Sequence, residues 1–179
     1  MALNGFNSDL MKKWIFMLLV LALIIAVSGC TTNQPVPANK TYSVNGLSFI
    51  CPGDWSELDK TAYQSALNDK GELLAVVGDG STIFGVVRLN KIKNQTDVTL
   101  DSLVIYYNAT LNANGTKYVS EGPVTVDGVK GYEITVKALE NYLSGVFFIK
   151  NGTNYLIAFE SSDNDQKTLD QIISSLKVV

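Results

Sequence analysis

Three dipeptides that each stand between two apolar runs constrain the fold of this 179-residue chain more than any other feature. They are Asn45-Gly46, Asp127-Gly128 and Asn151-Gly152. Such pairs are typical of two-residue β-hairpin turns, because Asn, Asp and Gly tolerate the positive φ angles that these turns need. A hairpin joins antiparallel strands, so three of them argue against a parallel sheet. We therefore expect a mainly antiparallel sheet.

Apolar runs on both sides of these turns predict the strands. The expected strands are residues 42–44, 47–51, 73–77, 83–89, 118–126, 129–138, 142–149 and 155–159. Residues 56–71 have only a weak helical pattern and are left ambiguous between helix and loop. The chain shows no internal repeat.

Two later segments carry apolar residues at helical spacing. In the first, the apolar face consists of Leu100, Leu103, Val104, Tyr107 and Leu111, with Thr99 as N-cap and Asn114-Gly115 as stop. In the last, the apolar face consists of Leu169, Ile172, Ile173 and Leu176. Asp163 and Gln166 have the spacing of a capping box and predict the start of this last helix. The order of elements predicts an α+β domain whose central, mainly antiparallel sheet is covered by helices.

The N-terminal 29 residues have the pattern of an export signal. Lys12 and Lys13 precede an apolar run, residues 14–27, which is shorter than the roughly 20 residues that a membrane-spanning helix needs. We therefore interpret residues 1–29 as a signal peptide, of which residues 1–10 form a start-site extension before Met11. The alternative is an uncleaved anchor helix, because residues 10–27 together approach spanning length.

Ser28, Gly29 and Cys30 follow the apolar run and resemble the lipobox of bacterial-type lipoproteins. The resemblance implies that Cys30 becomes the mature N-terminus and is S-diacylated, with fatty-acyl chains such as palmitate. Membrane lipid, reached through Cys30, would be one partner of the chain. The expected location is the cell membrane, lipid-anchored and facing the extracytoplasmic side. Residues 30–41 are then the lipidated cysteine and a flexible tether, because they are polar, contain two prolines and lack apolar periodicity.

The composition restricts the remaining partners. Removal of residues 1–29 takes away Lys12, Lys13 and Asp9, and changes the net charge from −3 to about −4. No cluster of Lys or Arg is present, so we expect no nucleic-acid partner. Cys51 lies in an apolar strand and is interpreted as a buried core residue. A disulfide between Cys30 and Cys51 is the alternative if Cys30 is not lipidated.

The chain contains no histidine. This excludes Ser-His-Asp and Cys-His catalysis, and it excludes zinc sites with a histidine ligand. Two cysteines are also too few for a thiolate zinc cluster. Carboxylate pairs, as in glycosidases, and Ser-Lys pairs remain chemically open. We expect no catalytic residue, no metal and no cofactor, and we expect the protein not to be an enzyme.

Two acidic groups are candidates for a cation site. Residues 163–165 read Asp-Asn-Asp, but they lack the glycine and the distal glutamate of an EF-hand loop. An N-cap with carboxylates in the first helical turn is the simpler interpretation. The second group is Asp54, Glu57 and Asp59, for which a solvated turn is the simpler interpretation.

Four Asn-X-Thr tripeptides are candidate N-glycosylation sites in an exported chain. Asn114 and Asn151 lie in predicted turns and are the best placed, and Asn94 is a third candidate. Asn108 falls within the predicted helix. A chain rich in Asn and Thr also produces such tripeptides by chance.

The opening of the domain resembles the G-x-x-F-x-x-P-x-x-W opening of PsbP-like families, with Gly46, Phe49, Pro52 and Trp55 at that spacing. Residues 131–133 and the closing helix at 168–176 also resemble the family pattern. The resemblance covers residues 42–179 and implies an α/β/α sandwich with a six- or seven-stranded antiparallel sheet. Known members assist photosystem II or bind a small GTPase, and their metal-associated residues include histidine. Since this chain has none, it is more similar to the family's short exported lipoproteins.

Three functions are compatible with these observations. The first is a membrane-anchored, extracytoplasmic lipoprotein with a non-enzymatic domain that binds or supports another, unknown envelope protein. The second is a small-molecule or lipid carrier with an apolar pocket between sheet and helix. The third is a carboxylate-based hydrolase, which needs two acids roughly 5 to 9.5 Å apart in a cleft.

Overall fold

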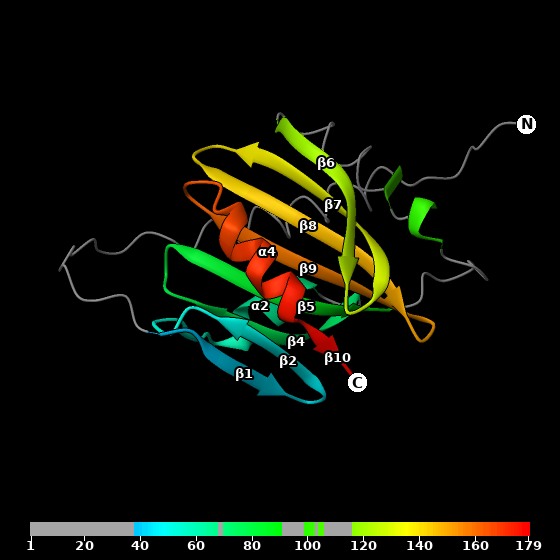
Figure 1. Cartoon of the computed structure of the whole chain (residues 1–179). Coiled ribbons are helices and arrows are strands. Elements are labelled where there is room, and N and C mark those ends of the chain that lie inside the picture. Colours follow the sequence, from blue (N-terminus) through cyan, green and yellow to red (C-terminus); the bar gives the residue numbers. More distant parts are fainter. Residues whose placement is uncertain (1–37, 68–69, 91–98, 103, 106–115) are drawn as a thin grey trace, which may run out of the picture.

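A seven-stranded sheet forms the centre of the structure, a computed structural model that describes residues 38–67, 70–90, 99–102, 104–105 and 116–179. Its strands are β3 (Ser56–Glu57), β4 (Gly71–Gly78), β5 (Thr82–Leu89), β6 (Lys117–Val126), β7 (Val129–Ala138), β8 (Asn141–Lys150) and β9 (Thr153–Ser161). They lie in the order β3-β4-β5-β9-β8-β7-β6, and every neighbouring pair is antiparallel (Figure 1). The expected antiparallel sheet of an α+β domain is confirmed.

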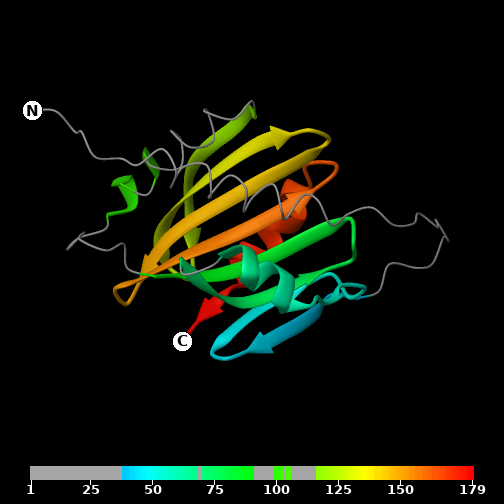
Figure 2. The ribbon, with the colours of Figure 1, turned by 180° about the vertical axis from the view of Figure 1, so that it is seen from behind.

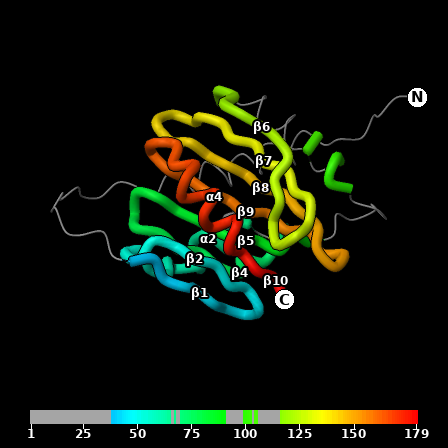
Figure 3. Tube along the Cα trace, in the orientation of Figure 1, coloured from blue at the N-terminus to red at the C-terminus, as the bar shows by residue number. Residues whose placement is uncertain are grey.

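A smaller sheet of three strands lies beside the large one. It consists of β1 (Lys40–Val44), β2 (Leu47–Cys51) and β10 (Lys177–Val178), in the order β1-β2-β10. The backbone N–H of Val179 continues this pairing by donating to the carbonyl of Gly46 at 2.9 Å. The Cα trace shows that segments from the two ends of the described chain, β1 and β10, lie on either side of β2 (Figure 3).

The three predicted hairpin turns are present. Asn45, Asp127 and Asn151 have φ angles of 47°, 47° and 52°, and the glycine after each of them also has a positive φ. Two consecutive residues with positive φ define the type I′ turn, whose twist matches that of the flanking strands. The local turn chemistry thus sets the register of β1 with β2, of β6 with β7 and of β8 with β9.

Helices lie on both faces of the large sheet. Helix α4 (Gln166–Ser175) lies on the same face as the small sheet, and α2 (Lys60–Leu67) lies on the opposite face (Figures 1 and 2). The expected α/β/α arrangement is therefore present. Residues 100–102 and 104–105 are also helical, and Leu100 and Val104 pack against the α2 face. The predicted remainder of that helix lies outside the described residues.

The predicted N-cap of the first helix is confirmed. The N–H of Ser102 donates to the hydroxyl of Thr99 at 3.2 Å, and the N–H of Thr99 donates to the hydroxyl of Ser102 at 3.1 Å. These two reciprocal bonds satisfy N–H groups that a helix leaves without intrahelical partners at its start.

Under α4 lies the main core. Leu169 and Ile172 have no exposed surface, and they pack with aromatic and aliphatic side chains of β5, β8 and β9. Ring contacts connect the hairpin to the large sheet, with centroid distances of 5.2 Å between Tyr42 and Phe49 and 4.9 Å between Phe49 and Phe84. Trp55 is buried and stacks on Phe159, with 6.5 Å between the ring centroids.

A second core lies on the α2 face. Its buried side chains come from α2 and from the strands β5, β7, β8 and β9, and they are Leu67, Val87, Leu89, Ile134, Val136, Leu143, Phe147 and Leu156. Tyr63 of α2 packs against Val76 and Ile83 in a smaller adjoining cluster. The two helical faces of the sheet thus have separate cores. No helix among the described residues is long and apolar enough to cross a membrane.

The predicted capping box of the last helix is wrong by two residues. The N-cap is Asp165, whose carboxylate accepts a hydrogen bond from the N–H of Thr168 at 3.1 Å. Asn164 has a φ of 56°, so the chain reverses direction between Asp163 and the helix. Asp163 instead accepts a hydrogen bond from the hydroxyl of Ser161 at 2.9 Å.

We expect Asp165→Ala to lower the free energy of unfolding by about 1 kcal/mol, because an N-cap carboxylate that is lost leaves helix N–H groups unpaired. Urea unfolding followed by fluorescence measures the change. Asp163→Ala is the matched control and is expected to have the smaller effect. A larger effect at position 163 than at 165 would restore the sequence-based assignment of the cap.

Candidate functional site

The structure describes only part of the sites that the sequence predicts. Cys30, Asn94 and Asn114 lie outside the described residues. Asn151 is exposed in the turn between β8 and β9, as a glycan acceptor would need to be. Cys51 is a free cysteine with no exposed surface in β2, which agrees with its interpretation as a core residue.

The acidic groups near the start of the domain are occupied by local contacts. Glu57 forms an ion pair with Lys60 at 3.2 Å, and Asp59 accepts a hydrogen bond from the N–H of Thr61 at 2.9 Å. Both bonds lie around the beginning of α2. Among the described residues, no group of three or more Cys, Asp or Glu side chains is arranged to hold a metal ion.

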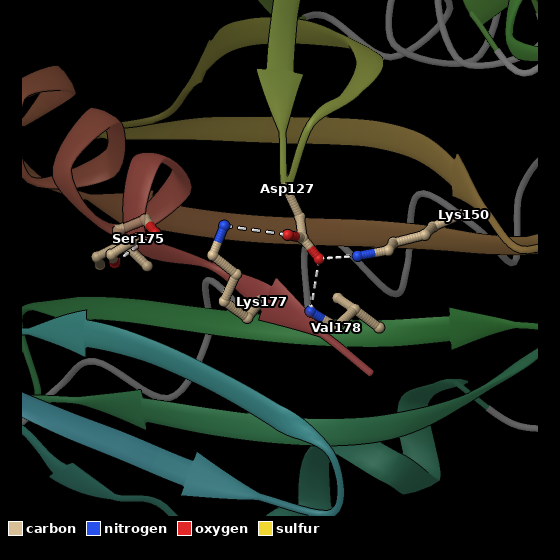
Figure 4. A network of polar contacts seen from close by, with 6 residues as sticks. Asp127, Lys150, Ser175, Lys177 and Val178 are labelled. Carbon is tan, nitrogen blue, oxygen red and sulfur yellow. Dashed lines mark hydrogen bonds and ion pairs between the residues drawn. The ribbon is translucent and has the colours of Figure 1, made fainter.

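Asp127 is the centre of the most connected charged network (Figure 4). It lies in the turn between β6 and β7, and its side chain is 8% exposed. One carboxylate oxygen pairs with the ammonium of Lys150 and accepts a hydrogen bond from the N–H of Val178 at 2.9 Å. The other oxygen pairs with Lys177 at 3.2 Å. One carboxylate thereby joins a turn of the large sheet to the C-terminal strand of the small sheet.

The electrostatics of Asp127 follow from these contacts. Burial alone would raise its pKa, but the hydrogen bonds from Lys150, Val178 and Lys177 outweigh burial and lower the pKa to about 2. The carboxylate is therefore charged throughout the physiological pH range. The hydroxyl of Ser175 accepts a hydrogen bond from the N–H of Ile50 at 2.9 Å and thus joins α4 to β2.

Glu160 is a second carboxyl group of interest, because it is fully buried near the end of β9. Its Oε1 accepts a hydrogen bond from the amide of Asn141 at 2.6 Å, whereas its Oε2 has no partner among the described residues. Burial raises the pKa of Glu160 more than the bond from Asn141 lowers it. The pKa of Tyr63 on α2 is raised too, first by burial and then by the charge of Glu160.

A third polar group lies at the start of α4. The amide of Gln166 donates to Glu133 at 3.0 Å and to Asp170 at 2.9 Å. On the same face, the hydroxyls of the buried Thr135 and Ser144 lie 2.8 Å apart, and Thr135 also donates to Glu133. These contacts join α4 to β7, and β7 to β8. Asp170 is exposed to solvent.

Sequence reasoning missed the roles of two of these acids. Asp127 was recognisable as a turn residue, but its partners are 23, 50 and 51 positions away along the chain. The sequence does contain a signal for the burial of Glu160, because Glu160 follows Leu156 and Ala158 at alternate positions of a strand. Alternation places it on the same face as the buried Leu156. A charged residue on an inward face indicates a buried polar contact.

Comparisons with known proteins agree with this fold. A family model described as PsbP-like protein matches residues 28–178. A search of curated proteins found no significant match. The solution structure of cyanobacterial PsbP (CyanoP) from Synechocystis sp. PCC 6803 is similar to this chain with a TM-score of 0.54 and 16% identity, over 84% of this chain and 98% of that one. At this identity the similarity shows the fold.

Two further solved structures are more distant. PA94 from Pseudomonas aeruginosa, a protein of unknown function described as a putative regulator, matches with a TM-score of 0.42 and 11% identity, over 76% of this chain and 97% of that one. LpqN of Mycobacterium tuberculosis, described as involved in cell envelope biogenesis, matches with a TM-score of 0.45 and 10% identity, over 82% of this chain and 87% of that one. Neither similarity carries a functional argument.

Proposed function

The chain belongs to the PsbP-like protein family, and we propose that it is an extracytoplasmic lipoprotein attached to the membrane through Cys30. Its folded domain would bind or support another protein of the cell envelope without catalysing a reaction. The fold is compatible with this function but does not determine it, because one fold can carry many functions.

The burial of Cys51 is the observation that carries the anchor. The chain has two cysteines, and Cys51 has no exposed surface and no disulfide partner in the described part of the chain. Acylation would give Cys30, the other cysteine, a role. The apolar run at residues 14–27 would direct export and so bring Cys30 to the outer face of the membrane. The first strand begins at Lys40, ten residues later, which leaves a short tether.

Two observations support a non-enzymatic domain. The sequence contains no histidine, which removes the commonest general base of hydrolases. Two partly buried acids of the described structure bond to neighbouring elements. Asp127 accepts a hydrogen bond from the C-terminal strand, and Glu133 accepts one from the amide of Gln166 in α4. Charged groups in these positions stabilise contacts between secondary-structure elements.

The two alternatives have less support. A carrier would need an apolar pocket between sheet and helix. On the α4 face this space is filled by Leu169, Ile172 and the aromatic side chains beneath them. A carboxylate hydrolase would need a sheltered pair of acids. Glu133 and Asp170 do converge on one amide, but Asp170 is exposed to solvent.

The anchor predicts a definite N-terminus. Mass spectrometry of the protein isolated from its native membrane should find a mature chain that begins with a diacylated Cys30. The Cys30→Ser variant should keep its N-terminal segment and lack the acyl mass. A wild-type chain with an intact Met11 terminus and no acyl group would refute the anchor.

The partner requires a separate experiment. Crosslinking in the native membrane, followed by identification of the captured proteins, should recover the same envelope protein with the wild type and with Cys30→Ser, because binding belongs to the folded domain. Recovery that depends on Cys30 would mean that only the lipid brings the two proteins together. That result would contradict a binding role for the domain.

A further inference from the structure

Three large apolar side chains are exposed at one end of the large sheet. Leu139 lies in the turn between β7 and β8 and is 81% exposed, and Tyr118 and Val119 at the start of β6 are 49% and 37% exposed. The start of β6 pairs with the end of β7, with Lys117 opposite Lys137 and Tyr118 opposite Val136. We call Tyr118, Val119 and Leu139 the end patch.

Turn chemistry does not explain Leu139. The three hairpin turns with Asn-Gly or Asp-Gly have residues suited to positive φ, whereas this turn has Leu139-Glu140. Leu139 nevertheless adopts a φ of 56°, which is unfavourable for a residue with a branched apolar side chain. A strained, exposed leucine contributes neither to the turn nor to the core. Such an outlier is a reason to look for a function.

The end patch lies at the end of the domain where the tether enters. Strand β1 begins with Lys40 at the same end of the structure as the turn between β7 and β8, and the views from opposite sides agree on this (Figures 1 and 2). Ten residues separate Cys30 from Lys40. Even a fully extended segment of that length spans at most about 35 Å. An acylated Cys30 would therefore hold this end of the domain close to the bilayer.

The chemistry of the end patch fits the boundary between lipid and water. Tyrosine is enriched there because its ring is apolar and its hydroxyl is polar. Lys117 and Lys137 flank the patch and suit the phosphates of anionic lipids, and Lys137 also lies over the ring of Tyr142 at 5.1 Å. The negative charge of the exposed Glu140 offsets part of the positive charge of these two lysines. Two further acids, Asp163 and Asp165, lie at this end. Their carboxylates accept hydrogen bonds from the hydroxyl of Ser161 and the N–H of Thr168.

We propose that the end patch inserts into the interface of the membrane to which the chain is anchored. The bilayer is its occupant, and the contact would hold the domain against the membrane by one defined end. The proposal rests on the proposed anchor at Cys30. It adds a second attachment, and a lipid-anchored protein is held more stably by two weak attachments than by one.

Fluorescence of a label at position 139 tests the contact. The full chain with Leu139→Cys, isolated with its acyl group, is labelled with an environment-sensitive fluorophore and reconstituted into vesicles of phosphatidylcholine and phosphatidylglycerol. Asn151→Cys is the matched control, because Asn151 is also an exposed turn residue with positive φ and lies at the opposite end of β8. Cys51 is buried in both variants. Flotation of the vesicles reports the anchor independently.

We expect the emission of the label at 139 to shift to the blue and to be quenched by brominated lipid, while the label at 151 stays unquenched. Flotation of the protein without quenching at 139 would overturn the insertion and leave the anchor intact. A blue shift at 139 without quenching by lipid would indicate a protein partner or a second copy of the chain, and would also overturn it. Equal quenching at both positions would contradict a contact through one end. Failure to float would count against the anchor and the insertion together.

Discussion

Replacement of Asp127 by asparagine is expected to lower the free energy of unfolding by about 2 kcal/mol at pH 7. The pKa of Asp127 falls from an ordinary value of 3.8 to about 2 on folding. A difference of this size corresponds to about 2.5 kcal/mol of folding free energy. The amide of the variant can still accept the N–H of Val178, but Lys150 and Lys177 lose their anionic partner.

The effect of Asp127→Asn should depend on pH in a definite direction. Because the pKa of Asp127 is lower in the folded state, its contribution is fully present above pH 3.8 and disappears as the pH falls towards about 2. The wild type and the variant should therefore differ in stability at neutral pH and converge in acid. Urea unfolding at a series of pH values, followed by the fluorescence of Trp55, measures both free energies.

A local measurement separates this role from a general loss of stability. Without the carboxylate, β10 loses the ion pair between Lys177 and Asp127, so the N–H groups of Val178 and Val179 should exchange with solvent faster. Asp54→Asn, the same change at an exposed position, is the control and should leave stability and exchange unchanged. Equal effects of both substitutions would show that the network around Asp127 has no special role.

The second large effect is expected to be stabilising. Glu160→Gln should raise the free energy of unfolding at pH 7 by about 1–3 kcal/mol, because the buried wild-type carboxyl group must either ionise away from water or bind a proton at this pH, whereas glutamine is neutral. The wild-type carboxyl group is fully buried, and one of its oxygens has no partner in the described structure. Glutamine remains neutral at every pH, and its carbonyl oxygen can still accept the hydrogen bond from Asn141.

The pH dependence of this effect has the opposite sign to that of Asp127. Burial raises the pKa of Glu160 above its ordinary value of 4.5, so the folded state favours the neutral acid. As the pH rises from that value, the wild type should lose about 1.4 kcal/mol per pH unit until the folded group ionises as well. Glu160→Gln should lack this loss. The difference between the two proteins should therefore be small near pH 4 and larger at pH 7.

Glu140→Gln is the control for Glu160→Gln, because Glu140 is exposed in the adjacent turn. It should leave the unfolding curve unchanged at both pH values. A destabilising effect of Glu160→Gln at pH 7 would contradict the prediction, since it would mean that the ionised carboxylate has a partner that stabilises it. Urea unfolding at pH 4 and pH 7 distinguishes these outcomes.

The hairpins were predictable because their information is local. Asn45-Gly46 and Asn151-Gly152 meet the φ requirements of their turns, and neighbouring strands follow directly. The sequence does not decide the helix at residues 60–67, because its apolar pattern is weak and its position depends on Tyr63 and Leu67 packing under the sheet. The cap of α4 was misplaced because Asn164 reverses the chain, which the capping-box spacing does not reveal.

The sequence by itself determined the antiparallel character of the sheet and the set of chemistries that a chain without histidine cannot perform. These follow from turn residues, apolar periodicity and composition, which act over a few residues. Only the tertiary structure decided that β10 joins the first hairpin, that Asp127 holds it and that Glu160 is buried beside Asn141. Their partners are distant in sequence, and contacts of that kind form only once the strands have packed.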